Sequence, residues 1–229
     1  MPGDTFPTVS SLWQGALLGS IVNAVMTAFE PEYASIQGWS NNTYLVDNWN
    51  GHFAMIGFGK KCRVAAFFMD PKSPLSPFIQ NSTSHMNVVL NQMPRCCRLF
   101  ANQGPLKFYH QELNDKYQAC FTTAFWAETD DDVDSHDTWS VIYENGAHII
   151  RIQLLDDISS AMMEWEDSYQ MEQWQSDLAL SLFNRRILEP ESEWNLLPNE
   201  LSLLMKSHNK RAFDLSLTKF SEILFNIPG

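Results

Sequence analysis

The chain has 229 residues, of which 45% are apolar, 13% aromatic and 18% charged. This composition excludes an intrinsically disordered chain and supplies enough apolar side chains for a sizeable core. The net charge of −12 and the isoelectric point near 4.8 argue against nucleic acid as a partner and against an anionic membrane surface.

Residues 10–30 are predicted to form a helix, with Ser10 or Ser11 as its cap and Pro31 stopping it near Phe29. Its apolar positions recur at helical spacing: Trp13, Leu17, Ile21, Ala24, Val25 and Ala28. Residues 12–29 are mostly apolar, but the chain has no Lys or Arg before Lys60, whereas a secretory signal needs a positive start. We therefore expect a buried helix of a cytoplasmic protein and no membrane partner.

Residues 41–155 are predicted to be rich in strands. The expected strands are 41–47, 52–58, 62–69, 119–126 and 148–155, and the second and third are joined by a hairpin at Gly59-Lys60-Lys61. Residues 71–78 contain three prolines and are expected to form a surface loop. Helices are expected at 84–93, at 94–102 and after Asp137, which would cap a short helix that ends before Gly146.

From residue 156 to residue 229 the chain is predicted to be mostly helical. Strands in the middle with helices before and after them do not fit a doubly wound parallel sheet. We expect a single α+β domain over residues 1–229, with a central, mostly antiparallel sheet flanked by helices and a helical C-terminal third.

The acidity of the chain is concentrated in one window. Between Tyr117 and Asn184 there are 14 acidic side chains and one basic side chain, Arg151, which makes a net charge of −13. The remaining residues carry 13 acids and 14 bases, a net charge of +1. Concentrated negative potential steers and orients a basic partner, although the same charge can serve only to keep a surface solvated.

The densest part of this window is TDDDVDSHDTW, residues 129–139. Asp130, Asp132 and Asp134 alternate as in the first half of an EF-hand loop, but Ser135 replaces the required glycine and Val141 the bidentate glutamate. We interpret the segment first as a docking surface, second as a solvated loop and third as a weak cation site. His136, among aspartates, is expected to tie the loop together.

No established catalytic motif is present. The chain lacks GxSxG, HExxH, GxGxxG and a cysteine zinc pattern, and its six histidines show no metal-ligand spacing, so no cofactor or metal is predicted. The four cysteines form no disulfide framework and are expected to be free thiols. A hydrolase-type enzyme stays the alternative, and it would require a cluster such as His52 or His148 near Cys120.

Trp165, Tyr169 and Trp174 lie in the acidic helical stretch. Packing in the core is the default interpretation of such rings. If they are exposed, they form apolar anchors inside a ring of charge, which is the usual anatomy of an interaction hot spot.

Residues 39–58, WSNNTYLVDNWNGHFAMIGF, with CRVAAFF following, and TTAFW (122–126) with YENGAHIIRIQLLD (143–156) resemble bacterial proteins of polymorphic-toxin neighbourhoods. In these neighbourhoods, small acidic cytosolic proteins act as immunity factors. The resemblance covers about residues 10–180 and implies that the chain binds a cognate toxin without catalysis, with the segment before YENGAH as a variable acidic contact loop.

The sequence therefore predicts a non-catalytic protein that neutralises a cognate toxin, or binds another basic protein, by stoichiometric docking. A regulatory binding protein outside toxin biology would present the same surface. The predicted contact residues are Glu128, Asp130, Asp131, Asp132, Asp134, Asp137, Trp139, Glu164, Trp165, Glu166, Asp167, Tyr169 and Trp174.

Overall fold

A six-stranded sheet forms the centre of the protein. The computed structural model describes residues 5–108, 110–113, 115–189 and 195–224. The strand order is β1-β2-β3-β4-β7-β8, and every neighbouring pair is antiparallel. The strands are β1 (Gln37–Ser40), β2 (Thr43–Asp47), β3 (Phe53–Phe58), β4 (Val64–Met69), β7 (Thr123–Ala127) and β8 (Val133–Asp134). The α+β fold with a mostly antiparallel sheet is thereby confirmed.

The two faces of the sheet pack against different helices. Because side chains alternate along a strand, Ile56, Phe68 and Phe125 point to one face and Met55, Phe67 and Trp126 to the other. The first face packs against α1 (Val9–Thr27) and α5 (Trp139–Glu144), and the second against α3 (Ser84–Gln92), α4 (Arg95–Gln103) and the 3₁₀ turn η2 (Pro105–Lys107). Coverage on both faces explains why β3 and β4 are buried at every position.

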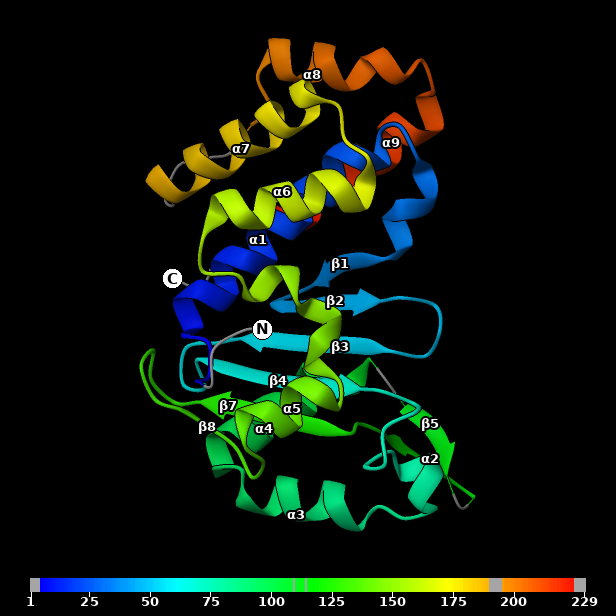
Figure 1. Ribbon diagram of the computed structural model, residues 1–229, viewed down its shortest axis with the longest axis vertical. Helices are drawn as coiled ribbons and strands as arrows, with labels where there is room; N and C mark the ends of the chain where they lie inside the picture. Colours follow the sequence, from blue (N-terminus) through cyan, green and yellow to red (C-terminus); the bar gives the residue numbers. More distant parts are fainter. Residues whose placement is uncertain (1–4, 109, 114, 190–194, 225–229) are drawn as a thin grey trace.

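A helical layer covers the β1 end of the sheet, as the upper part of Figure 1 shows. It consists of α6 (Ile158–Tyr169), α7 (Gln173–Leu188), α8 (Pro198–Leu204), the turn η5 (Met205–Ser207) and α9 (Lys210–Leu224). Helix α1 contacts α6, α7 and α9 as well as the turn η1 (Pro31–Ser35). The helical C-terminal third is confirmed for the described residues.

Helix α1 is long and apolar enough to cross a membrane, but 78% of its most apolar stretch is buried inside this fold. Its flanks differ slightly from the prediction. Thr8 is the cap, because its Oγ1 accepts a hydrogen bond from the Ser11 backbone N–H at 3.0 Å, and the helix ends at Thr27 rather than near Phe29.

The predicted strand at 148–155 is wrong. This segment forms two 3₁₀ turns, η3 (Ala147–Ile150) and η4 (Ile152–Leu154). Ala147, Ile150 and Gln153 are buried at a spacing of three, which is the period of a 3₁₀ helix. A short apolar run is ambiguous between strand and helix, and here contact with α1 decides it.

Several short elements were not predicted. They are β1, β8, the helix α2 (Pro77–Gln80) inside the expected loop 71–78, and a hairpin of β5 (His110–Leu113) and β6 (Lys116–Ala119). Asp137 was predicted to cap α5, but the N-cap residue is Thr138. The carboxylate of Asp137 instead lies beside His85.

Candidate functional site

The acidic loop, defined as residues 128–137, follows β7 along the edge of the sheet. Glu128, Asp130, Asp131, Asp132 and Asp134 are all exposed, while Asp137 is half-buried. Several contacts hold the loop in place, including an ion pair and a hydrogen bond to β7. Arg63 donates from Nε to Asp130 Oδ1 at 2.7 Å and from a terminal nitrogen to Oδ2 at 3.2 Å, and Ser135 Oγ donates to the Ala124 carbonyl at 2.6 Å. These contacts therefore fix the course of the loop, from which most of the acidic side chains are exposed to solvent.

The predicted acids of α6 are only partly available. Glu164 and Glu166 are half-buried and Asp167 is exposed. Arg151, the one base of the acidic window, forms its ion pair with Glu164. The guanidinium donates to that carboxylate, and this hydrogen bond raises the pKa of Arg151. The acidic loop is thus left without a compensating base from its own window.

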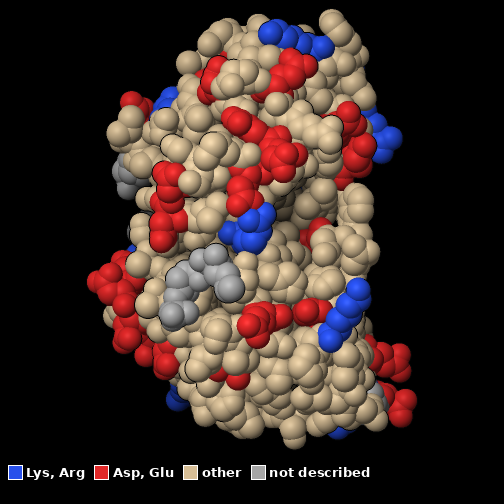
Figure 2. Space-filling model, viewed as in Figure 1, with Lys and Arg blue, Asp and Glu red and all other residues tan. Residues whose placement is uncertain are grey.

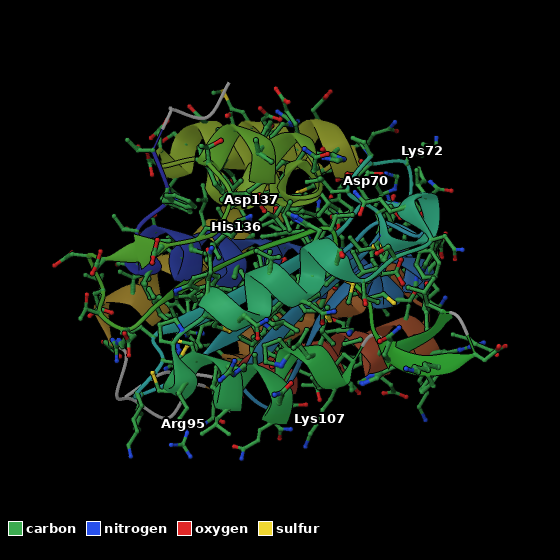
Figure 3. The ribbon with its side chains drawn as sticks, turned by 90° about the horizontal axis from the view of Figure 1, so that it is seen from below. Asp70, Lys72, Arg95, Lys107, His136 and Asp137 are labelled. Atoms are coloured by element: carbon green, nitrogen blue, oxygen red, sulfur yellow. The ribbon has the colours of Figure 1, made fainter. Side chains whose placement is uncertain are left out.

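Acidic side chains are gathered on one face of the molecule, which also carries some basic side chains. Figure 2 shows acidic side chains over α6 and along the left edge beside the acidic loop on the same face. Figure 3, a view from below, places Asp70, Lys72, His136 and Asp137 on one side of α3 and Arg95 and Lys107 on the other. Negative potential is therefore concentrated around the acidic loop and α6.

Core packing, the default interpretation of the aromatic side chains, is confirmed, and their inclusion among the contact residues is wrong for Trp139, Trp165 and Tyr169. Trp139, Trp165 and Tyr169 are only 4%, 7% and 7% exposed and belong to the core. Trp174 is half-buried, packs edge-on against Phe29 and carries the Lys206 ammonium 4.6 Å from its ring centroid. These side chains hold α5, α6 and α7 onto α1 and the sheet. Apolar positions at helical spacing usually face the core, as Trp139, Trp165 and Tyr169 do.

An exposed tryptophan occurs elsewhere, in the loop DNWNGH between β2 and β3. Trp49 is 61% exposed and has φ = +60°, and Gly51 has φ = +83°. Asp47 Oδ1 accepts from the Trp49 backbone N–H at 2.7 Å, which holds this left-handed conformation. In the sequence, the only signal at Trp49 is the turn composition around it.

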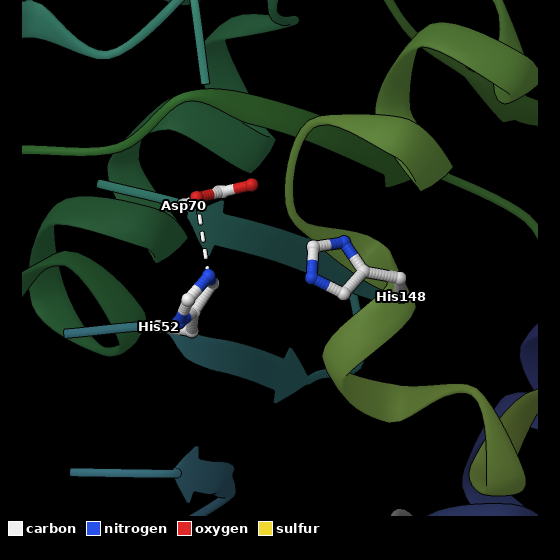
Figure 4. Close-up of side chains that lie close together, drawn as sticks. All are labelled: His52, Asp70 and His148. Atoms are coloured by element: carbon white, nitrogen blue, oxygen red, sulfur yellow. Dashed lines mark ion pairs between the residues drawn. The ribbon is translucent and has the colours of Figure 1, made fainter. Parts of the chain in front are cut away.

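Next to this loop, the fold assembles His52, Asp70 and His148. The β3–β4 register pairs Phe53 with Met69, so His52 and Asp70 lie at adjacent strand ends, with His52 Nε2 3.1 Å from Asp70 Oδ1. His148 comes from η3 and turns a ring nitrogen toward that pair (Figure 4). The ring centroids of the two histidines are 5.7 Å apart.

Two of the sequence motifs supply the histidines of this cluster: His52 ends DNWNGH and His148 ends YENGAH. In YENGAH, Gly146 has φ = +152°, and a Cβ there would lie 2.6 Å from Phe68 Cβ, so only glycine allows the close approach. Asn145 bridges the strand ends, because it accepts from Ser73 Oγ through its side chain and from Thr122 Oγ1 through its carbonyl. The motifs behind the resemblance thus meet in one place.

Hydrogen bonds fix the proton positions in this cluster. Asn48 Oδ1 accepts from the backbone N–H groups of Asn50 and His52, so its amide nitrogen faces His52 Nδ1 at 3.2 Å and donates to it. The neutral His52 ring therefore carries its proton on Nε2, toward Asp70. His148 Nδ1 lies 3.2 Å from the Tyr143 carbonyl and donates to it, so the lone pair of the neutral ring is on Nε2.

The groups around this cluster do not form a recognisable nucleophile. Thr122 Oγ1 donates to the backbone carbonyls of Phe68 and Asn145, and Ser73 Oγ donates to Asn145, so neither hydroxyl is activated by a histidine. Cys120 donates to the Gln118 carbonyl, and burial raises the pKa of its thiol. The cluster consists of two histidines and one carboxylate, and Cys120 does not belong to it.

A second cluster contains His85 of α3 with His136 and Asp137 of the acidic loop. His85 Nε2 lies 3.2 Å from Asp137 Oδ2, and the rings of His85 and His136 are 5.7 Å apart. His136 Nδ1 lies 2.9 Å from Gln92 Oε1, which only accepts, so Nδ1 donates. The expected role of His136 in tying the loop together agrees with this contact to α3.

A groove of about 350 Å³ lies over β1, β2 and β3 beside α9. Leu45, Met55 and Phe108 contribute apolar walls, and the charged lining residues are Asp47, Lys219 and Glu222. Lys219 Nζ is 3.1 Å from Glu222 Oε2, which also accepts from the Trp39 backbone N–H at 3.2 Å. Lys219 and Glu222 therefore pair with each other.

No protein-family model, no curated protein and no solved structure matches the chain. A functional assignment therefore depends on the geometry of the acidic loop and of the two histidine clusters.

Proposed function

We propose that the protein is a non-catalytic, cytoplasmic binding protein that neutralises a cognate bacterial toxin, or another basic protein, by stoichiometric docking. The observation that supports this proposal is the exposed acidic loop. Its acids lie on a face shared with α6, and the one base of the acidic window is paired with Glu164. Because the predicted aromatic side chains are buried or half-buried, the proposed contact surface consists of carboxylates. Such a surface favours electrostatic steering over apolar anchoring.

Three exposed acids of the loop form no ion pair within the described part of the chain, and the hydrogen bond that Asp134 Oδ1 accepts from the Ser135 backbone N–H at 2.8 Å can also be accepted by an asparagine. Asp131, Asp132 and Asp134 are exposed, whereas Asp130 is bonded to Arg63. The combined variant Asp131→Asn, Asp132→Asn and Asp134→Asn keeps the shape of the loop and removes three charges. A matched control, Glu30→Gln, Glu32→Gln and Glu112→Gln, removes three exposed charges outside the acidic window.

The test is co-expression of this protein with the products of the genes next to its own, followed by toxicity assays. Pull-downs are then compared at about 0.1 M salt and at about 0.5 M salt, and exposed charges are strongly screened at the higher concentration. We expect one neighbouring product to be toxic alone, to be neutralised by the wild type and to be retained at a one-to-one ratio. The loop variant should weaken retention at least tenfold, and the control variant should not. A toxic neighbour that is neither bound nor neutralised would overturn the proposal, and a non-toxic stoichiometric partner would indicate a regulatory binding protein.

The hydrolase alternative rests on the cluster of His52, Asp70 and His148. Hydrolysis of a small ester or phosphate panel that is lost in His148→Gln and retained in the loop variant would move that alternative to the front.

A further inference from the structure

The cluster of His85, His136 and Asp137 has the features of a metal site. We propose that it binds a divalent transition-metal ion of the Zn²⁺ class. One nitrogen or oxygen from each side chain lies within 4.8 Å of the others. His85 stands in the first turn of α3, and His136 and Asp137 immediately precede α5, so the fold brings the three together.

Two atoms of the cluster are buried without a hydrogen bond. His85 Nε2 and Asp137 Oδ2 are 3.2 Å apart, close enough for an ion pair, yet neither has a hydrogen-bond partner of acceptable angle. Buried polar atoms normally have such partners. Ligands around a zinc ion with bonds of about 2.0–2.1 Å lie about 3.0–3.4 Å apart, with lone pairs that converge on the ion instead of on each other.

The hydrogen bond of His136 suits the same role. Because His136 donates from Nδ1 to Gln92 Oε1, its Nε2 keeps a lone pair. A metal-ligating histidine usually holds its other nitrogen in this way, which fixes the tautomer and the ring orientation. Gln92 is therefore a positioning residue for His136.

The ligand set selects the class of ion. Two imidazoles and one carboxylate suit zinc and its first-row neighbours, whereas calcium and magnesium prefer oxygen ligands only. The adjacent Asp131, Asp132 and Asp134 raise the local cation concentration but lie outside the cluster. The ion would join the acidic loop to α3.

The chain provides a matched comparison in the cluster of His52, Asp70 and His148. Its three residue types are the same, but Asn48 donates to His52 Nδ1 and so places the ring proton on Nε2, the nitrogen that faces Asp70. A ligand nitrogen must be free of its proton. This cluster should bind zinc weakly or not at all.

The test is a zinc titration of the isolated protein, without a histidine tag, in competition with a chromophoric chelator. We expect one Zn²⁺ per chain, with Ca²⁺ failing to compete. His85→Gln, His136→Gln and Asp137→Asn should each weaken binding at least tenfold, and Gln92→Leu about tenfold. His52→Gln, His148→Gln and the loop variant Asp131→Asn, Asp132→Asn and Asp134→Asn should leave the affinity within about twofold to threefold.

Cobalt supplies a readout for variants that fold poorly. Co²⁺ bound to the wild type should show the visible bands of a four- or five-coordinate nitrogen and oxygen site, and Zn²⁺ should remove them. Absence of saturable zinc binding, or binding that follows His52 and His148 or the aspartates of the loop, would overturn the assignment. Partner binding is not part of this test, so its outcome is independent of the docking proposal.

Discussion

Cys96 and Glu128 show how a single neighbour sets the chemistry of a side chain. The Cys96 thiol donates to Glu128 Oε1 at 2.8 Å, and this hydrogen bond to the carboxylate is the main reason that the pKa of Cys96 is raised to about 11. Burial and the nearby Cys97 raise it further. The thiol is therefore protonated at neutral pH, which makes it a poor nucleophile.

Alkylation of the folded protein checks this pKa. Cys96 is half-buried while Cys62, Cys97 and Cys120 are buried, so the rate reports Cys96. We expect an apparent pKa near 11 in the wild type and a lower value in Glu128→Gln, because the variant loses the carboxylate. The pKa of the Cys96 thiol in the folded protein lies above its unfolded value of about 9. The protonated thiol therefore stabilises the folded state below pH 9, and this contribution is lost as the pH rises toward 11. A wild-type value near 9 would contradict the assigned contact.

At the scale of elements, a buried polar network joins α1, β1 and α6. Tyr169 Oη accepts from Gln37 Nε2 at 3.0 Å and from Asn23 Nδ2 at 3.3 Å. Gln37 in turn accepts from the Tyr44 hydroxyl, which accepts from Gln153 Nε2 at 2.9 Å. These groups are buried, so each bond fixes how one element sits on the next.

Removal of the Tyr169 hydroxyl should loosen this packing. Tyr169→Phe leaves the Gln37 amide without its acceptor, and we expect the free energy of unfolding to fall by about 1–3 kcal/mol. Tyr117→Phe is the control, because Tyr117 is 77% exposed and its loss of a hydroxyl should change stability by less than about 0.5 kcal/mol. Chemical denaturation of both variants measures the difference, and equal effects would mean that the network contributes no specific stability.

For the whole molecule, the separation of charge is the dominant electrostatic property. The window from Tyr117 to Asn184 carries a net charge of −13 against +1 for the rest. Like charges on one face repel, and this repulsion destabilises the compact state. Docking of a basic partner would relieve it.

Salt should therefore stabilise the protein. Raising NaCl from about 0.02 M to about 0.3 M shortens the screening length severalfold, and we expect Tm to rise. The variant Asp131→Asn, Asp132→Asn and Asp134→Asn should start at a higher Tm and gain less, whereas Glu30→Gln, Glu32→Gln and Glu112→Gln should behave like the wild type. A Tm that falls with salt would show that ion pairs such as Arg63–Asp130 outweigh the repulsion.

The sequence alone determined the class of fold and the distribution of charge. Apolar periodicity and turn residues predicted α1, the β3–β4 hairpin, α3, α4 and the C-terminal helices, because each of these follows from contacts close in the sequence. Only the tertiary structure decided the course of residues 148–155, the burial of Trp139, Trp165 and Tyr169, and the meeting of His85 with His136 and Asp137. Those features depend on segments far apart in the chain, and local propensity does not specify which of them pack together.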